Sequence, residues 1–162
     1  MKIVVSACLL GENCKYNGGN NRNDKLIQYL KGHEVIPVCP EVLGGLPTPR
    51  IPVELVDGKA IRRDGVSVDR AFHDGAVKAL EIALKNGVEL AILQSRSPSC
   101  GVKEIYDGSF SGTKISGQGI FTGMLMKKGI KVVDAEDIDS VFRSPHRYSS
   151  EEEIPDCGCI YG

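Results

Sequence analysis

The amino-acid sequence predicts a single three-layer α/β domain with a Rossmann-like, mostly parallel sheet. Short segments that are apolar throughout alternate with amphipathic segments of helical length, and this alternation is typical of doubly wound sheets. The chain has 162 residues, which is enough for one domain to bury a core without disulfide bonds. Because crossovers between parallel strands are right-handed, the four expected strands favour the sheet order 2-1-3-4.

The expected strands are short and apolar. The first contains Ile3-Val4-Val5, and the third contains Leu90, Ile92 and Leu93. Apolar runs of this length suit strands that are buried on both faces. The expected strands span residues 2–7, 34–38, 89–93 and 130–133.

Four helices are expected between and after these strands, over residues 24–31, 67–85, 119–128 and 135–142. Asn23 is a suitable N-cap for the first helix. The longest helix has an apolar residue every four positions, and Asn86-Gly87 is suited to end it. Its expected buried stripe consists of Val68, Phe72, Ala76, Leu80 and Leu84, widened by Val77 and Ala83.

Two hairpins are expected as insertions into this core. Asp57-Gly58 favours a tight turn with positive φ at both residues, joining strands at 53–56 and 59–62. A second hairpin is expected within residues 102–115. Repeated prolines between residues 40 and 54 allow one helical turn there at most.

Composition and charge argue against several classes of protein. The net charge of −1 provides no basic field for a polyanion, so binding to nucleic acid is not expected. The apolar run at the N-terminus is too short for a signal peptide, and no segment approaches the ~18 apolar residues of a membrane span. We therefore expect a cytoplasmic protein, whose six cysteines serve metal or redox chemistry rather than disulfide bonds.

Three cysteines follow three neighbouring strands of the expected sheet. Cys8 comes after the first strand, Cys39 after the second, and Cys100 in the loop after the third. Sheets of this kind bind ligands at the carboxyl ends of their strands, where neighbouring strands are ~4.8 Å apart. Any one of these cysteines could equally be a packing residue. Their joint placement leads us to expect that the three thiols share one metal centre.

The spacing of these cysteines favours an iron–sulfur cluster over zinc. Structural zinc sites have four protein ligands with short paired spacings, and none of the three cysteines is paired in that way. A cluster held by three thiolates would leave one iron open to a substrate. Cys14 remains ambiguous, as a fourth ligand, a sulfur relay or a packing residue.

Polar residues near these cysteines have both functional and structural interpretations. Glu41, two residues after Cys39, could relay protons or activate water, or it could favour the N-terminus of a short helix. Hydroxyl groups in the loop before Cys100 could bind a polar heterocycle or satisfy backbone groups; these belong to Ser95, Ser97 and Ser99.

Other residues are expected to lie outside the site. Arg50, Arg62 and Arg63 fall in the first hairpin region and are expected to be solvated at the surface. Residues 146–162 form a polar tail after a domain at 1–145, and Cys157 and Cys159 in this tail are expected to be incidental thiols.

Three blocks of sequence are distinctive in their order and spacing. They are Ser6-Ala7-Cys8-Leu9-Leu10-Gly11 with Cys14-Lys15-Tyr16-Asn17-Gly18, the block Pro37-Val38-Cys39-Pro40-Glu41-Val42-Leu43-Gly44-Gly45-Leu46-Pro47-Thr48-Pro49-Arg50, and Ser97-Pro98-Ser99-Cys100-Gly101. Together they closely resemble the thiouracil desulfurase (TudS) family, and the resemblance extends to about Val133.

The resemblance implies an α/β domain with an oxygen-sensitive [4Fe–4S] cluster, which removes sulfur from thiolated uracil to give uracil and hydrosulfide. The implied ligands are Cys8, Cys39 and Cys100. Glu41 is the implied acid/base group, which deprotonates water in a non-redox reaction, and Ser97 is a substrate-binding or proton-transfer hydroxyl. One departure is Asn17, where Asp is more frequent in the family.

Three other functions stay open. Cys8 and Cys14 could serve metal-free thiol redox chemistry or sulfur transfer. Members related to the resembled family also act on thiouridine in RNA. A nucleotide-binding module of Rossmann type is disfavoured, because no G-x-G-x-x-G follows the first strand.

Overall fold

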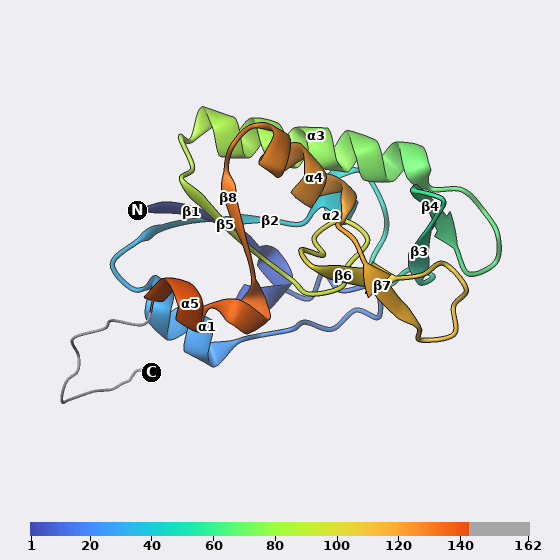
Figure 1. Cartoon of the computed structure of the whole chain (residues 1–162), viewed down its shortest axis with the longest axis horizontal. Coiled ribbons are helices and arrows are strands. Elements are labelled where there is room, and N and C mark those ends of the chain that lie inside the picture. The colour runs from blue at the N-terminus through green and yellow to red at the C-terminus, as the bar shows by residue number, and fades with distance from the viewer. Residues whose placement is uncertain (143–162) are drawn as a thin grey trace.

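A computed structural model of the chain describes residues 1–142 (Figure 1). Its strands, α-helices and two 3₁₀ turns follow in this order: β1 (Lys2–Ser6), η1 (Ala7–Leu10), α1 (Asp24–Leu30), β2 (Glu34–Val38), α2 (Pro40–Leu43), β3 (Val53–Val56), β4 (Lys59–Arg62), α3 (Asp69–Lys85), β5 (Leu90–Leu93), β6 (Glu104–Tyr106), β7 (Lys114–Ser116), α4 (Ile120–Lys127), β8 (Lys131–Asp134), η2 (Ala135–Asp137) and α5 (Asp139–Phe142).

The central sheet has four parallel strands in the order β2-β1-β5-β8. This arrangement confirms the predicted order of the first to fourth core strands. In β1, Val4 lies opposite Ile36 of β2 and Ala91 of β5. Since all four strands run the same way, their carboxyl ends meet at one edge of the sheet.

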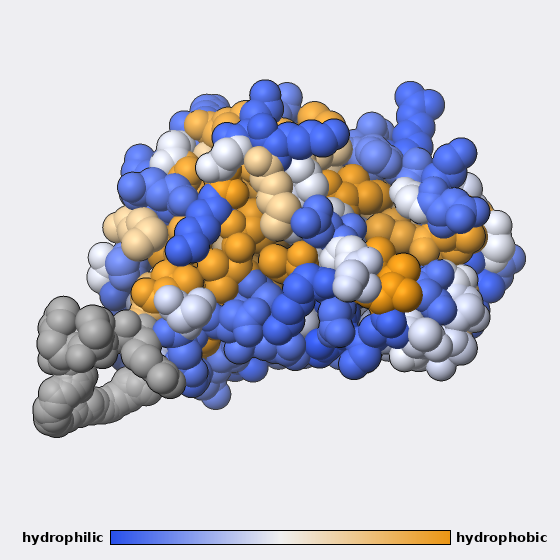
Figure 2. Space-filling view, viewed as in Figure 1, coloured by the Kyte–Doolittle hydropathy of each residue, from blue (hydrophilic) through white to orange (hydrophobic). Residues whose placement is uncertain are grey.

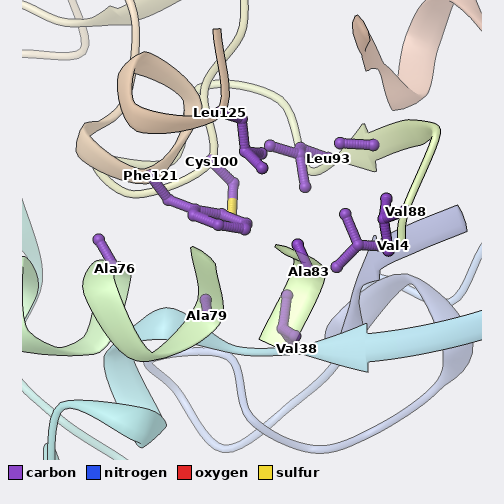
Figure 3. Packing of buried hydrophobic residues seen from close by; sticks show 11 residues of the cluster. Val4, Val38, Ala76, Ala79, Ala83, Val88, Leu93, Cys100, Phe121 and Leu125 are labelled. Atoms are coloured by element: carbon purple, nitrogen blue, oxygen red, sulfur yellow. The ribbon is translucent and has the colours of Figure 1, made fainter. Parts of the chain in front are cut away.

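Helices cover both faces of this sheet, which confirms the three-layer fold. In Figure 1, α3 and α4 lie on one side of the sheet, and α1 and α5 lie on the other. Val4 and Leu93 pack with Phe121 and Leu125 on the α3/α4 side (Figure 3), whereas Ile3 belongs to the cluster on the α1 side. The alternation follows from the strand geometry, because successive side chains point to opposite faces.

The buried face of α3 differs from the predicted stripe. Phe72, Ala76 and Ala83 are buried, but Val77 and Leu84 are 44% and 47% exposed. A repeat of four residues advances about 40° too far at each step around a helix with 3.6 residues per turn. Residues that continue the four-residue repeat therefore turn away from the sheet. The buried face of α3 is formed instead largely by small residues spaced three or four positions apart, among them Ala76, Ala79 and Ala83.

The two hairpins are confirmed as antiparallel pairs, β3 with β4 and β6 with β7. They lie beyond the carboxyl edge of the sheet (Figure 1). Asp57 and Gly58 have φ values of 51° and 80°, as the tight turn requires. The carboxylate of Glu54 on β3 accepts hydrogen bonds from the backbone N–H groups of Gly108 and Phe110 at 3.0 and 3.1 Å, which joins the two hairpins.

The prediction of one helix over residues 135–142 is wrong. Residues 135–142 form the 3₁₀ turn η2 and the short helix α5 rather than one continuous helix. Asp134 accepts a hydrogen bond from the backbone N–H of Glu136 and thereby caps the tight first turn. Cys157 and Cys159, together with the predicted tail, lie outside the described residues.

The surface of the viewed face mixes hydrophilic residues with exposed apolar ones (Figure 2). Within residues 1–142, no helix is both long enough and apolar enough to span a membrane.

Candidate metal centre

A cavity of about 480 Å³ opens at the carboxyl edge of the sheet. Segments that are far apart in the chain contribute to its wall, because the parallel strands all end here. The candidate cysteines and polar residues from the sequence that line this one cavity are Cys8, Cys14, Cys39, Glu41, Ser95, Ser97 and Cys100.

Cys8 is positioned by the 3₁₀ turn that follows β1. Gly11 ends this turn with a φ of 97°, which a residue with a side chain rarely adopts. The backbone N–H of Asn21 donates to the carbonyl of Cys8 at 2.9 Å, and its side-chain amide donates to the Cys8 sulfur at 3.5 Å. The loop rich in asparagine and glycine therefore folds back onto the first cysteine.

The Cys39 thiol donates a hydrogen bond to the backbone carbonyl of Cys14 at 3.9 Å, and Cys14 lies near enough to both Cys8 and Cys39 to change the pKa of their thiols. The neighbouring Cys14 thiol lowers the pKa of Cys8 to about 7, against the opposing effect of burial. It also lowers the pKa of Cys39, whereas the pKa of Cys14 itself is raised by the thiols of Cys39 and Cys8. A lowered pKa favours the thiolate, which is the form that binds metals.

Cys100 is buried at the boundary between the cavity and the core. It packs near Phe121 (Figure 3), and burial raises the pKa of its thiol well above the ordinary value. The hydroxyl of Ser97 accepts hydrogen bonds from the backbone N–H groups of Ser99 and Cys100, both at 3.1 Å. Ser97 therefore shapes the loop that carries Cys100.

Glu41 lies in the first turn of α2, a helix that begins directly after Cys39. Its Oε1 is 2.7 Å from Nη2 of Arg50, and its Oε2 accepts a long hydrogen bond of 3.5 Å from the Ser97 hydroxyl. Only 15% of the Glu41 side chain and 7% of the Arg50 side chain are exposed. The carboxylate is thus held at both oxygens inside the cavity.

The prediction that Arg50 is solvated at the surface is wrong. Its backbone N–H donates to the carbonyl of Tyr16 at 2.6 Å, so the proline-rich segment folds back over the cavity and places the guanidinium inside it. The sequence does show that Glu41 needs a positively charged partner if it is buried. The positions of Arg50, Arg62 and Arg63 along the chain do not show which of them points into the cavity. Arg62 pairs with Asp64 near the surface, and Arg63 lies 5.8 Å from the centre of the Phe110 ring at the cavity wall.

The loop serines have different environments. Ser95 is buried and donates to Asp134 at 2.6 Å, which ties the end of β5 to the end of β8. The hydroxyl of Ser99 is buried without a hydrogen-bond partner among residues 1–142. Ser97 is therefore the serine of this loop whose hydroxyl contacts Glu41.

The cysteines that line the cavity supply the thiolate ligands that iron–sulfur clusters use. Among residues 1–142, no three His, Cys, Asp or Glu side chains are grouped so as to hold one metal ion. A [4Fe–4S] cluster is larger than one ion, so its thiolate ligands stand further apart. Cys8, Cys39 and Cys100 around a cavity of about 480 Å³ fit a group of that size.

The fold and the candidate site define an α/β protein in which several cysteines line one cavity at the carboxyl edge of a parallel sheet. The model of the 2-thiouracil desulfurase family matches residues 3–137, and the chain belongs to this family. This match confirms the resemblance that the three sequence blocks indicated.

Two known proteins are similar to this chain over most of their length. "Uncharacterized protein YbbK" of Bacillus subtilis (strain 168) is 34% identical over 149 residues, covering 86% of this chain and 99% of the relative. The solved structure of "[4Fe-4S]-dependent thiouracil desulfidase TudS" is similar with a TM-score of 0.81 and 38% identity, covering 86% of this chain and 94% of the other. The family and the similar structure identify this chain as an enzyme.

Proposed function

We propose that this enzyme converts the thiocarbonyl group of a thiolated uracil to a carbonyl group and releases hydrosulfide. The proposed cofactor is a [4Fe–4S] cluster held by Cys8, Cys39 and Cys100, with Glu41 and Ser97 as the catalytic residues. The observation that carries the proposal is the presence of these three thiols and the Glu41 carboxylate in one cavity. The cluster dependence of the similar solved enzyme supports it.

The proposed reaction is a hydrolysis without net oxidation or reduction. Water adds its oxygen to the ring carbon, the carbon–sulfur bond breaks with both electrons going to sulfur, and sulfur leaves as hydrosulfide. When bound, the cluster would supply a Lewis-acidic iron without a cysteine ligand, which favours the departure of sulfur.

In the proposed reaction Glu41 and Ser97 transfer the proton, and Arg50 holds the Glu41 carboxylate. Arg50 occupies Oε1 of Glu41, so Oε2 is the oxygen that takes the proton from water. The Ser97 hydroxyl reaches the same Oε2 at 3.5 Å and can pass a proton between Glu41 and the substrate. General acid/base groups of this kind typically contribute about 10²–10⁴-fold in rate.

The proposed substrate is the free thiolated base, and the proposed location is the cytoplasm. Cys8, Cys14, Cys39 and Cys100 are free thiols, which suits a reducing compartment. The net charge of −1 gives no support to long contacts with RNA. Thiouridine in RNA is therefore the alternative substrate rather than the first one proposed. The proposed catalytic domain covers residues 1–145, with 146–162 as an appended tail.

A metal-free function in sulfur transfer or thiol redox chemistry is the second candidate. The presence of Cys14 beside Cys8 and Cys39 in one cavity favours it, because neighbouring thiols can undergo exchange reactions. It predicts a colourless protein whose thiols cycle through a disulfide or persulfide.

The deciding experiment is purification without oxygen, followed by iron and sulfide analysis and an assay of 2-thiouracil and 4-thiouracil. We expect an iron chromophore and release of one hydrosulfide for each uracil formed. Full turnover by a protein free of iron would overturn the cluster assignment in favour of thiol chemistry. Turnover of thiolated RNA without turnover of either free base would replace the proposed substrate.

A further inference from the structure

The guanidinium of Arg50 connects three segments that surround the cavity. Its Nη2 donates to Glu41 Oε1 at 2.7 Å and to the carbonyl of Cys14 at 2.9 Å. Its Nη1 donates to the carbonyl of Pro47 at 3.2 Å and to the hydroxyl of Thr48 at 3.0 Å. The side chain is 7% exposed, so all these contacts form in a nearly closed environment.

These contacts leave Glu41 little rotational freedom. Arg50 holds Oε1, and Ser97 contacts Oε2, so the plane of the carboxylate is defined from both sides. A planar guanidinium with several donors can hold a carboxylate and a carbonyl at once, which an ammonium group does less well. Arg50 therefore determines which Glu41 oxygen is available for proton transfer.

Stability alone is a poor explanation for this ion pair. Burying two charges costs desolvation energy that their attraction often only offsets, and a hydrophobic pair of similar volume is frequently as stable. Three of the four hydrogen bonds made by the Arg50 guanidinium hold the loop segments, and the fourth joins these segments to the carboxylate. The guanidinium thus links the Cys14 loop to the acid/base group.

We propose that Arg50 is a positioning residue for the desulfuration reaction, acting through Glu41 rather than on the substrate. The inference rests on the proposed function, because it needs Glu41 as the proton acceptor. This role differs from two others that Arg50 could have, which are direct contact with the substrate and purely structural support of the loop.

A double-mutant cycle tests this inference. Wild type, Arg50→Gln, Glu41→Gln and the double variant are reconstituted to equal iron content, and kcat and KM for thiouracil are measured. We expect Arg50→Gln to lower kcat by about 10²-fold, the effect that a small misplacement of a catalytic group can produce, with KM unchanged. In the Glu41→Gln background, loss of Arg50 should reduce kcat little further, because residues that act as a unit are not additive.

The matched control is Arg62→Gln, which removes an arginine paired with Asp64 outside the cavity and should leave both kcat and KM unchanged. If Arg50→Gln does not retain iron, the same cycle with Arg50→Lys keeps the charge and loses the planar donor set.

The outcomes separate this inference from the proposed function. An equal loss of kcat in both backgrounds would show a role independent of Glu41 and overturn the inference alone. A raised KM with unchanged kcat would assign Arg50 to the substrate and also overturn it. If Glu41→Gln turns over thiouracil like wild type, the acid/base role in the proposed function fails first, and the positioning role fails with it.

Discussion

Gly75 of α3 lies against Gly44 at the end of α2, so closely that a Cβ atom on Gly75 would stand 2.8 Å from the backbone nitrogen of Gly44. The same Cβ atom would overlap the carbonyl oxygen of Pro40. Real Cβ atoms do not come this near to a backbone, so only glycine permits this contact between the two helices. Since α2 carries Glu41 and begins directly after Cys39, the contact places both residues relative to the sheet.

We expect Gly75→Ala to move α2 away from α3 and to destabilise the protein by about 1–3 kcal/mol, the usual cost of overpacking. Thermal and urea unfolding measure this loss. Gly123→Ala is the matched control, because Gly123 lies within α4 and a Cβ there meets no atom within 4 Å. The control should gain up to about 1 kcal/mol from helix propensity. Equal stability of the Gly75 variant and wild type would contradict the close contact.

Replacing Cys8, Cys39 or Cys100 individually by serine should prevent stable binding of an iron chromophore. A hydroxyl is a poorer ligand than a thiolate for a soft iron–sulfur core. Iron and sulfide content after reconstitution, together with the visible absorbance, measures this effect. Cys157→Ser and Cys159→Ser serve as controls, because both positions fall outside the matched residues 3–137. Retention of the chromophore in Cys8→Ser would disprove its assignment as a ligand.

Glu41→Gln should keep the cluster and the fold but lose turnover. Glutamine is nearly isosteric and can still accept a hydrogen bond from Arg50, so the loss is that of the proton acceptor. We expect kcat to fall by about 10²–10⁴-fold. Anaerobic loss of the thiouracil absorbance, measured at equal iron content, gives the rate. Turnover near that of wild type would remove Glu41 from the mechanism.

Ser97→Ala should weaken the fold as well as the reaction, because two buried N–H groups lose their acceptor. The backbone N–H groups of Ser99 and Cys100 both point to the Ser97 hydroxyl, and both residues are buried. A buried donor left without a partner costs about 1–3 kcal/mol of the free energy of unfolding. Urea unfolding measures this change. Ser140→Ala removes an exposed hydroxyl and should change stability by less than about 0.5 kcal/mol.

Most of the core could be predicted because its signals are local in the sequence. Apolar runs mark all four parallel strands, and the right-handed crossover rule then determines their order. The residues on the buried face of α3 could not be predicted from local signals alone. Leu84 continues the four-residue repeat but is exposed, and glycine and alanine form the contact because α2 and the sheet approach closely.

The residues that meet in the cavity can be predicted where they follow strand ends, but not where they depend on the path of a loop. Cys8, Cys39 and Cys100 follow strands, and the parallel sheet brings them to one cavity. Arg50 reaches the same cavity because its segment folds back to Tyr16, a contact between residues far apart in the chain. No local pattern encodes that contact, so the sequence alone predicts a surface position for Arg50.

The separation of the three cysteines along the chain also constrains when a cofactor can be acquired. Cys8, Cys39 and Cys100 meet only through the pairing of β1 with β2 and with β5. A short peptide loop, of the kind that wraps a zinc ion as it is synthesised, contains none of these pairs of ligands. All three thiols can therefore hold one cluster only when this sheet pairing has formed, and a defect in the pairing of β1 would lower the cluster content as well as the stability.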